Sequence, residues 1–168
     1  MKKKACAFTG LRPEKLPMLT NKESVAYLRL RERIRAEIIR LIEIEHVRLF
    51  RSGMARGVDM LAARLVLELE TEYSNIALEC VIPYENQASS WTERERDEYF
   101  DILAHCDPSV MLQTHYSGGC LHRRNRYLVD SADVVLAVWN GADGGTAYTV
   151  EYAKKQEKEL IVINPDEE

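Results

Sequence analysis

The amino-acid sequence predicts an α/β protein with a mainly parallel sheet of about six strands and helices on both faces. The first observation is an alternation, along the whole chain, between short apolar runs and segments with helical apolar periodicity. The second is composition, because 46% hydrophobic and 30% charged residues in a chain of 168 allow a real core. The third is that no repeat, low-complexity stretch or Gly/Ser linker divides the chain, so residues 1–168 are expected to form a single domain.

The first strand is expected at residues 5–9, an apolar run that stops at Gly10. Thr20 and Glu23 then have the spacing of a capping box, in which a side chain and the backbone cap each other at a helix start. Apolar residues recur at helical intervals after this pair. The pattern predicts a long helix over about 21–45.

The middle of the chain repeats this order. Residues 47–51 are expected to form a second strand that stops at Gly53. An apolar stripe with helical spacing begins after Gly57 and predicts the next helix. A third strand is expected at 76–82, where Pro83 ends it.

The last part of the chain begins with a second capping-box spacing, between Ser90 and Glu93, which predicts a charged helix over about 91–105. The same alternation continues to the end of the chain. The remaining expected elements are a strand at 110–112, a short helix at 121–131, a strand at 134–139, a helix at 146–157 and a strand at 160–163.

The net charge and the hydropathy of the chain argue against two classes of partner, nucleic acid and membrane. The chain has 23 Lys and Arg against 27 Asp and Glu, a net charge of −4. A mildly acidic chain disfavours a broad nucleic-acid-binding surface. No apolar run approaches the roughly 20 residues that span a bilayer, and the run at 5–8 is too short for a signal peptide. We therefore expect a cytoplasmic protein without a membrane partner, and nucleic acid is not the expected ligand.

Three expected loops stand out at one edge of the sheet. Ligands of open α/β sheets bind beyond the carboxyl ends of the strands. The loops there are TGLRP at 9–13, SGMARGVD at 52–59 and NGADGGT at 140–146, and the last two contain five of the eight glycines. Both open directly into a helix, whose free N–H groups attract phosphate, while glycine lets the backbone approach the anion. The sequence therefore predicts an anion site at this edge.

Within that site, backbone amides of the two glycine-rich loops would hold phosphate. Arg12 and Arg56 would add positive charge, and Asp59 would shape its loop or accept a hydrogen bond from ribose. Asn125 lies in the basic run 122–126 and is a further candidate, whereas the rest of that run is expected on an exposed helix face. The predicted ligand-binding residues are Thr9, Gly10, Arg12, Gly53, Met54, Ala55, Arg56, Gly57, Asp59, Asn125, Trp139, Gly144, Gly145 and Thr146.

Catalysis is not indicated by any recognisable motif, because no nucleophile is seen with a partnered base. If the protein is an enzyme, a carboxylate must act, and Asp59, Asp133, Asp143 and Glu151 all stay open as that acid. The four cysteines contain no CxxC pair and match no common zinc module. We therefore expect reduced, buried thiols and no metal site.

Taken together, these motifs resemble the YpsA-like family of the SLOG superfamily. The resemblance rests on the loops at 9–13 and 52–59, on RNRY at 124–127 followed by Val129-Asp130, and on GGT at 144–146. It implies a three-layer, Rossmann-like fold that binds a small nucleotide or nucleotide-derived ligand, such as ADP-ribose or NAD. A sensor or regulator of that ligand is the function we expect, and a homo-oligomer stays open.

Two relatives within that superfamily imply alternative functions. The DNA-processing protein A family binds single-stranded DNA and has a loop similar to residues 55–59 and a segment similar to 124–126. The LONELY GUY phosphoribohydrolases cleave the N-glycosidic bond of nucleoside monophosphates with a glutamate close behind their Gly-Thr corner. Here Glu151 falls five residues past Thr146, later than that motif requires. Single-stranded DNA binding and glycosidic hydrolysis are therefore the alternatives to ligand sensing.

Overall fold

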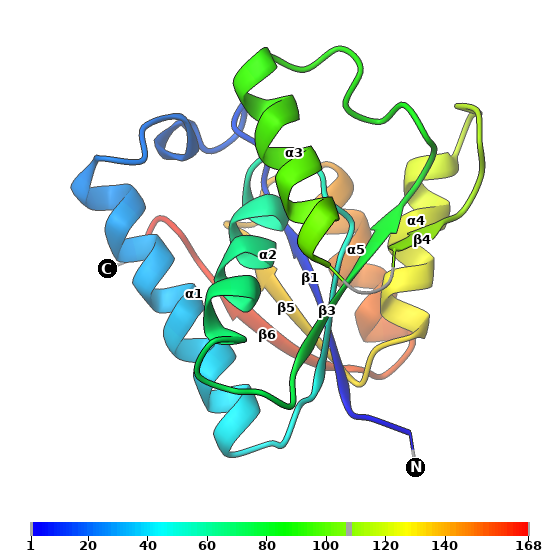
Figure 1. Ribbon diagram of the computed structural model, residues 1–168. Helices are drawn as coiled ribbons and strands as arrows, with labels where there is room; N and C mark the ends of the chain where they lie inside the picture. Colours follow the sequence, from blue (N-terminus) through cyan, green and yellow to red (C-terminus); the bar gives the residue numbers. More distant parts are fainter. Residues whose placement is uncertain (1, 107–108, 168) are drawn as a thin grey trace.

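Six parallel strands form one sheet with the order β4-β3-β2-β1-β5-β6 in the computed structural model, which describes residues 2–106 and 109–167. Helices α1, α2 and α3 pack together on one face, and α4 and α5 pack together on the other (Figure 1). The predicted α/β class with a parallel sheet is confirmed. The strands are β1 Ala5–Gly10, β2 Leu49–Ser52, β3 Ala77–Ile82, β4 Ser109–Met111, β5 Val134–Val138 and β6 Glu159–Ile163; the helices are α1 Val25–Glu43, α2 Val58–Leu69, α3 Glu93–His105, α4 Cys120–Asp130 and α5 Gly145–Lys155.

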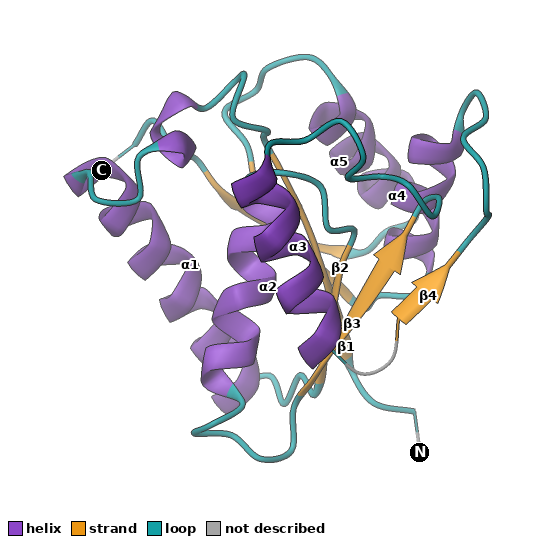
Figure 2. Cartoon of the chain, turned by 45° about the horizontal axis from the view of Figure 1, so that its top comes forward, coloured by secondary structure: helices purple, strands orange, loops and turns teal. Residues whose placement is uncertain are grey.

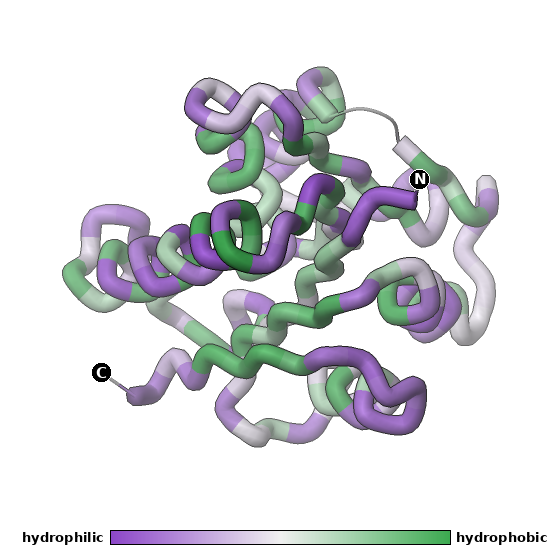
Figure 3. Tube along the Cα trace, turned by 90° about the horizontal axis from the view of Figure 1, so that it is seen from below, coloured by the Kyte–Doolittle hydropathy of each residue, from purple (hydrophilic) through white to green (hydrophobic). Residues whose placement is uncertain are grey.

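The central strand β1 organises the core. It pairs with β2 on one side and with β5 on the other, so that Cys6 lies beside both Phe50 and Val134. The rings of Phe8 and Phe50 stack with their centroids 5.8 Å apart, and both are buried. Figure 3 shows the apolar residues concentrated along the strands, while the helices carry polar residues on their outer turns. Burial of β1 on both faces explains its continuous apolar run.

The start of α1 differs from the prediction. The N-cap is Ser24, whose hydroxyl accepts a hydrogen bond from the backbone N–H of Tyr27, 3.1 Å away. Thr20 instead ends a short 3-10 helix, Pro17–Thr20, and its hydroxyl donates to the Pro17 carbonyl. A proline at the first position favours such a turn, which takes Thr20 out of position to cap the next helix. The predicted capping box of Thr20 and Glu23 is therefore wrong.

The start of α3 also differs. Thr92 and Glu95 form the capping box, with the Thr92 hydroxyl accepting from the Glu95 N–H and the Glu95 carboxylate accepting from the Thr92 N–H. The predicted pair, Ser90 and Glu93, has the same spacing, but the Trp91 N–H bonds the Ala88 carbonyl in a turn that ends the preceding loop. The other elements begin and end within two residues of their predicted bounds.

The strands all point to one edge, where the longest loops gather (Figure 2). The loops that follow β1, β2 and β5 therefore meet beyond the same ends of neighbouring strands. None of the helices formed by the described residues has the length and hydropathy of a membrane span.

Replacing Phe50 by alanine is expected to lower the free energy of unfolding by about 3–5 kcal/mol, because a fully buried ring would leave a cavity beside Phe8. Phe100→Ala is the matched control, since that ring on α3 is 58% exposed and its removal should cost about 1 kcal/mol or less. Urea-induced unfolding followed by circular dichroism measures both variants. Equal losses would contradict this placement of Phe50.

Candidate functional site

A cleft of about 330 Å³ lies beyond the ends of β1 and β5, two neighbouring strands whose following connections cross opposite faces of the sheet. The connection after β1 runs over one face toward β2, whereas the connection after β5 runs over the other, which leaves a crevice beyond the ends of these two strands. We call it the β1–β5 cleft. It is lined by Thr9, Gly10, Leu11, Arg12, Glu14, Lys15, Ala55, Asp59, Leu121, His122, Arg124, Asn125, Asp143, Gly145 and Thr146.

The cleft brings together residues from all three loops that the sequence singles out. Ala55 and Asp59 come from the loop after β2 and the start of α2, and Gly145 and Thr146 form the start of α5. Asn125 enters from α4. The predicted residues that line the cleft are Thr9, Gly10, Arg12, Ala55, Asp59, Asn125, Gly145 and Thr146.

Other predicted residues support the cleft without lining it. Gly144 is the N-cap of α5 and has φ 134° and ψ −158°, a conformation that essentially only glycine adopts. Gly145 has no positive φ, so the need for glycine in this loop falls on Gly144. Trp139 is half-buried against the core, and its indole N–H donates to the Ala142 carbonyl at 2.8 Å. Trp139 therefore shapes the loop after β5 and lies outside the cleft lining.

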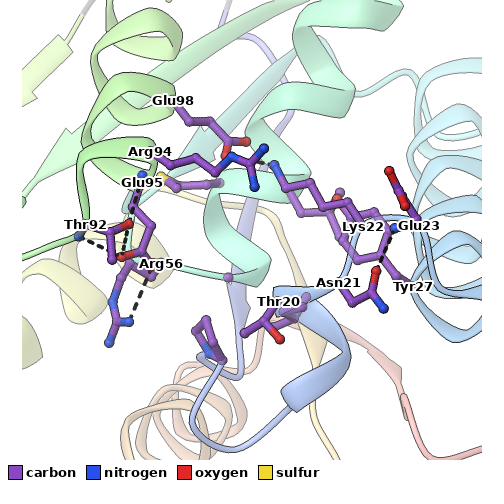
Figure 4. Close-up of a pocket in the computed structure, with 15 residues that line it drawn as sticks. Thr20, Asn21, Lys22, Glu23, Tyr27, Arg56, Thr92, Arg94, Glu95 and Glu98 are labelled. Atoms are coloured by element: carbon purple, nitrogen blue, oxygen red, sulfur yellow. Dashed lines mark hydrogen bonds and ion pairs between the residues drawn. The ribbon is translucent and has the colours of Figure 1, made fainter.

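Arg56 and Gly57 border a different, larger cavity of about 820 Å³ between the 3-10 helix, α2 and α3 (Figure 4). The Arg56 guanidinium is bonded to the carboxylates of Glu14 and Glu95. Figure 4 shows Arg56 beside Thr92 and Glu95 at one end of this cavity. Its charge is thus already balanced by two acids, and it is not among the residues that line the β1–β5 cleft.

Arg124 is the residue that the sequence interpretation misplaced. It is only 2% exposed, whereas the basic run was expected on an exposed helix face apart from Asn125. Its guanidinium donates to the Gly53 carbonyl at 2.6 Å and to the amide oxygens of Gln87 and Asn125 at 3.2 and 2.9 Å. A Cβ on Gly53 would lie within 2.8 Å of this guanidinium, so glycine is required there for space.

A signal for the burial of Arg124 is present in the helical spacing. Cys120 and Leu128 stand four residues before and after it, and both are buried. Residues four apart share a helix face, so Arg124 continues the buried stripe of α4. Arg123 and Arg126, by contrast, are exposed.

Asp59 is a buried carboxylate at the floor of the cleft. Burial raises its pKa, while the positive charge of Arg124 acts in the opposite direction. One carboxylate oxygen accepts a hydrogen bond from the Ala55 N–H at 3.2 Å, and the Asp59 carbonyl accepts one from the Ser52 hydroxyl at 2.8 Å. Asp59 therefore closes its loop and presents a carboxyl group to the cleft at the same time.

Two cations of the cleft come from the segment after β1. Lys15 donates to the Asp143 carbonyl and so connects the loop after β1 to the loop after β5. Arg12 is exposed, and no residue in 2–106 or 109–167 accepts a hydrogen bond from its guanidinium. Lys15 was not predicted as a site residue, because its partner lies 128 residues away in the sequence.

The candidate acids separate into two groups. Asp133 accepts a hydrogen bond from the Ala5 N–H at 2.8 Å, at the opposite ends of β1 and β5. Glu151 is exposed on α5 and pairs with Lys154. Neither lines the cleft, whereas Asp59 and Asp143 do.

The stability of the protein is expected to depend on pH through Asp59. The pKa of Asp59 in the folded state is raised above the ordinary 3.8. The protonated carboxyl therefore contributes fully to the free energy of unfolding below pH 3.8, and this contribution is lost as the pH rises through the folded-state pKa. Asp59→Asn keeps the acceptor for Ala55 and does not titrate. Urea unfolding of both proteins from about pH 4 to about pH 7 should therefore show the wild type losing stability relative to the variant. A constant or opposite difference would show that burial does not control this carboxyl.

Several known proteins are similar in sequence. A UPF0398 protein of Halalkalibacterium halodurans is 29% identical over 160 residues, which cover 93% of this chain and 83% of that protein. A UPF0398 protein of Brevibacillus brevis is 31% identical over 119 residues, covering 70% of this chain and 63% of that protein. A UPF0398 protein of Bacillus cereus is 28% identical over 156 residues, with coverages of 91% and 84%.

Two solved structures share the fold. One is DNA processing protein A from Helicobacter pylori, described by its single-stranded DNA binding mode, with a TM-score of 0.64 and 17% identity. The other is DNA processing protein A from Streptococcus pneumoniae, with a TM-score of 0.63 and 15% identity. Each likeness covers 96% of this chain, but only 65% and 50% of the longer proteins.

The family itself is established by sequence over nearly the full length. A profile of the YspA SLOG family matches residues 6–167. This range includes every loop that forms the β1–β5 cleft. The protein therefore belongs to the YspA SLOG family.

Proposed function

We propose that the β1–β5 cleft binds the phosphate groups of a small nucleotide-derived ligand and that the protein acts as a sensor or regulator of that ligand. The observation that carries this proposal is the uncapped start of α5 beside an unpaired arginine. Gly144 offers no side chain to cap the helix, and Gly145 and Thr146 line the cleft together with Arg12. Free N–H groups at a helix start and a nearby guanidinium are a favourable environment for phosphate.

The charges of the cleft support the same ligand class. Arg124 is held inside the protein by its own hydrogen bonds, and Asp59 lies close enough to balance it. Arg12 and Lys15 are the cations left to face a ligand, because Lys15 bonds only a backbone carbonyl and Arg12 bonds nothing in the described residues. A volume of about 330 Å³ lies at the lower end of small-molecule sites. These features fit a phosphate-bearing small molecule such as ADP-ribose or NAD.

Glycosidic hydrolysis is a second candidate, and the buried carboxyl of Asp59 is the observation that favours it. A raised pKa in a cleft is typical of a general acid. Glu151, the acid nearest in sequence to the position used by phosphoribohydrolases, is not among the residues that line the cleft and pairs with Lys154. Chromatography of nucleoside monophosphates after incubation tests this candidate, and release of free base that is lost in Asp59→Asn would favour hydrolysis over sensing.

Arg12→Ala and Lys15→Ala are each expected to weaken binding of ADP-ribose by about tenfold or more, because a hydrogen bond to a charged group contributes about 1.5–3 kcal/mol. Arg64→Ala is the matched control, since Arg64 pairs with Asp101 between α2 and α3, outside the cleft. Isothermal titration calorimetry measures the affinities, after a thermal-shift screen of nucleotides. Equal affinities in all four proteins would remove the cleft as the phosphate site.

The dissociation constant for single-stranded DNA is expected to lie above the micromolar range at physiological salt. The reason is that Arg124, the first arginine of the segment at 124–126, is buried, and the net charge is −4. Fluorescence anisotropy with labelled oligonucleotides at several salt concentrations checks this. Tight binding whose salt dependence falls in the Arg123→Ala, Arg126→Ala double variant would instead favour the DNA alternative.

A further inference from the structure

A second cavity of about 390 Å³ adjoins the β1–β5 cleft. The two share Arg12, Ala55 and Leu121 as lining residues, so they meet at the unpaired arginine. The rest of this cavity is formed largely by the segment between β3 and α3, including Tyr84 and Trp91. We call it the β3–α3 cavity. Of its lining residues, Arg12, Ala55 and Arg56 are among the predicted ligand contacts, whereas Tyr84 and Trp91 are not.

Each of its two aromatic rings packs against a neighbouring ring. Trp91 packs edge-to-face on the buried ring of Tyr99, with centroids 5.3 Å apart and planes at 83°. Tyr84 packs edge-to-face on Tyr116 at 5.4 Å and 80°. Both rings are half-buried, so part of each remains accessible. Such rings can stack on a planar aromatic group without reorganising.

Polar groups in the same cavity lack partners. Within the described residues, nothing is bonded to the Tyr84 hydroxyl, the Trp91 indole N–H or the Ser90 hydroxyl. Gln87, in contrast, is fixed by Arg124 and by the Gly53 carbonyl. Aromatic faces combined with free donors and acceptors suit a heteroaromatic ring that carries amide or amine groups.

We propose that the β3–α3 cavity binds one base of a pyrophosphate-linked dinucleotide whose phosphates and other nucleoside lie in the β1–β5 cleft. Arg12 stands between the two cavities and contacts the pyrophosphate from the side of the ring. Each cavity alone has the volume of a small-molecule site, so a ligand with a single base, held in the β1–β5 cleft, would leave the β3–α3 cavity empty. This inference rests on the proposed phosphate site and specifies the class of its ligand.

Calorimetry with three probes tests it: NAD, diadenosine pyrophosphate and ADP-ribose. ADP-ribose has the pyrophosphate but only one base, so at least one of the two probes that carry two bases should bind about tenfold more tightly, as expected for one stacked base. Trp91→Ala should abolish this preference and leave the affinity for ADP-ribose within about twofold. Tyr84→Ala, at a more peripheral ring, provides a second variant should Trp91→Ala fail to fold. Phe100→Ala is the control, since that ring also packs on Tyr99 but lines neither cavity.

The outcomes separate this inference from the proposed function. Suppose that ADP-ribose binds with an affinity that depends on Arg12, but neither NAD nor diadenosine pyrophosphate binds more tightly than ADP-ribose. The phosphate site in the β1–β5 cleft then stands, and the base site in the β3–α3 cavity is overturned. The same conclusion follows if Trp91→Ala or Tyr84→Ala weakens all three probes equally. If no probe binds to the wild type, the proposed phosphate site fails first.

Discussion

The buried guanidinium of Arg124 is the interaction on which the carboxyl edge of the sheet depends. A buried charge that lacks partners costs several kcal/mol, so every group around it must be held in place. The Gly53 carbonyl, Gln87 and Asn125 bond it directly, and Asp59 supplies the opposing charge. These partners belong to the loop after β2, the segment after β3, and helices α4 and α2. One cation thus fixes elements from both faces of the sheet relative to each other.

Some cations at this edge of the sheet already have partners within the protein, whereas others are free to bind a ligand. Arg124 is hydrogen-bonded to buried carbonyl oxygens and faces the charge of Asp59, and Arg56 is paired with Glu14 and Glu95. Arg12 has no such partner in the described residues and borders both cavities. Together with Lys15, which bonds only a backbone carbonyl, Arg12 therefore concentrates the electrostatic attraction for an anion in the segment after β1, although the protein as a whole is acidic.

The sequence was sufficient for the fold and for the loops of the site, because both depend on local patterns. Alternating strand and helix periods specify a parallel sheet, and parallel strands bring the loops that follow them to one edge. The helix starts were misplaced because two serine or threonine residues lie near the start of each helix, and only the neighbouring turns select between them. Lys15 could not be predicted, since its partner at Asp143 is brought near only by the folded sheet.

The position of β1 in the middle of the sheet has a consequence for biosynthesis. Its second neighbour, β5, begins at Val134, so a growing chain leaves one edge of an apolar strand unpaired until the residues of β5 have been translated. Long-range parallel pairing of this kind is slow and leaves partly folded chains prone to association. The cleft, which needs the loops after both strands, cannot form before the residues that follow β5 have been translated, so no ligand can assist the earlier steps.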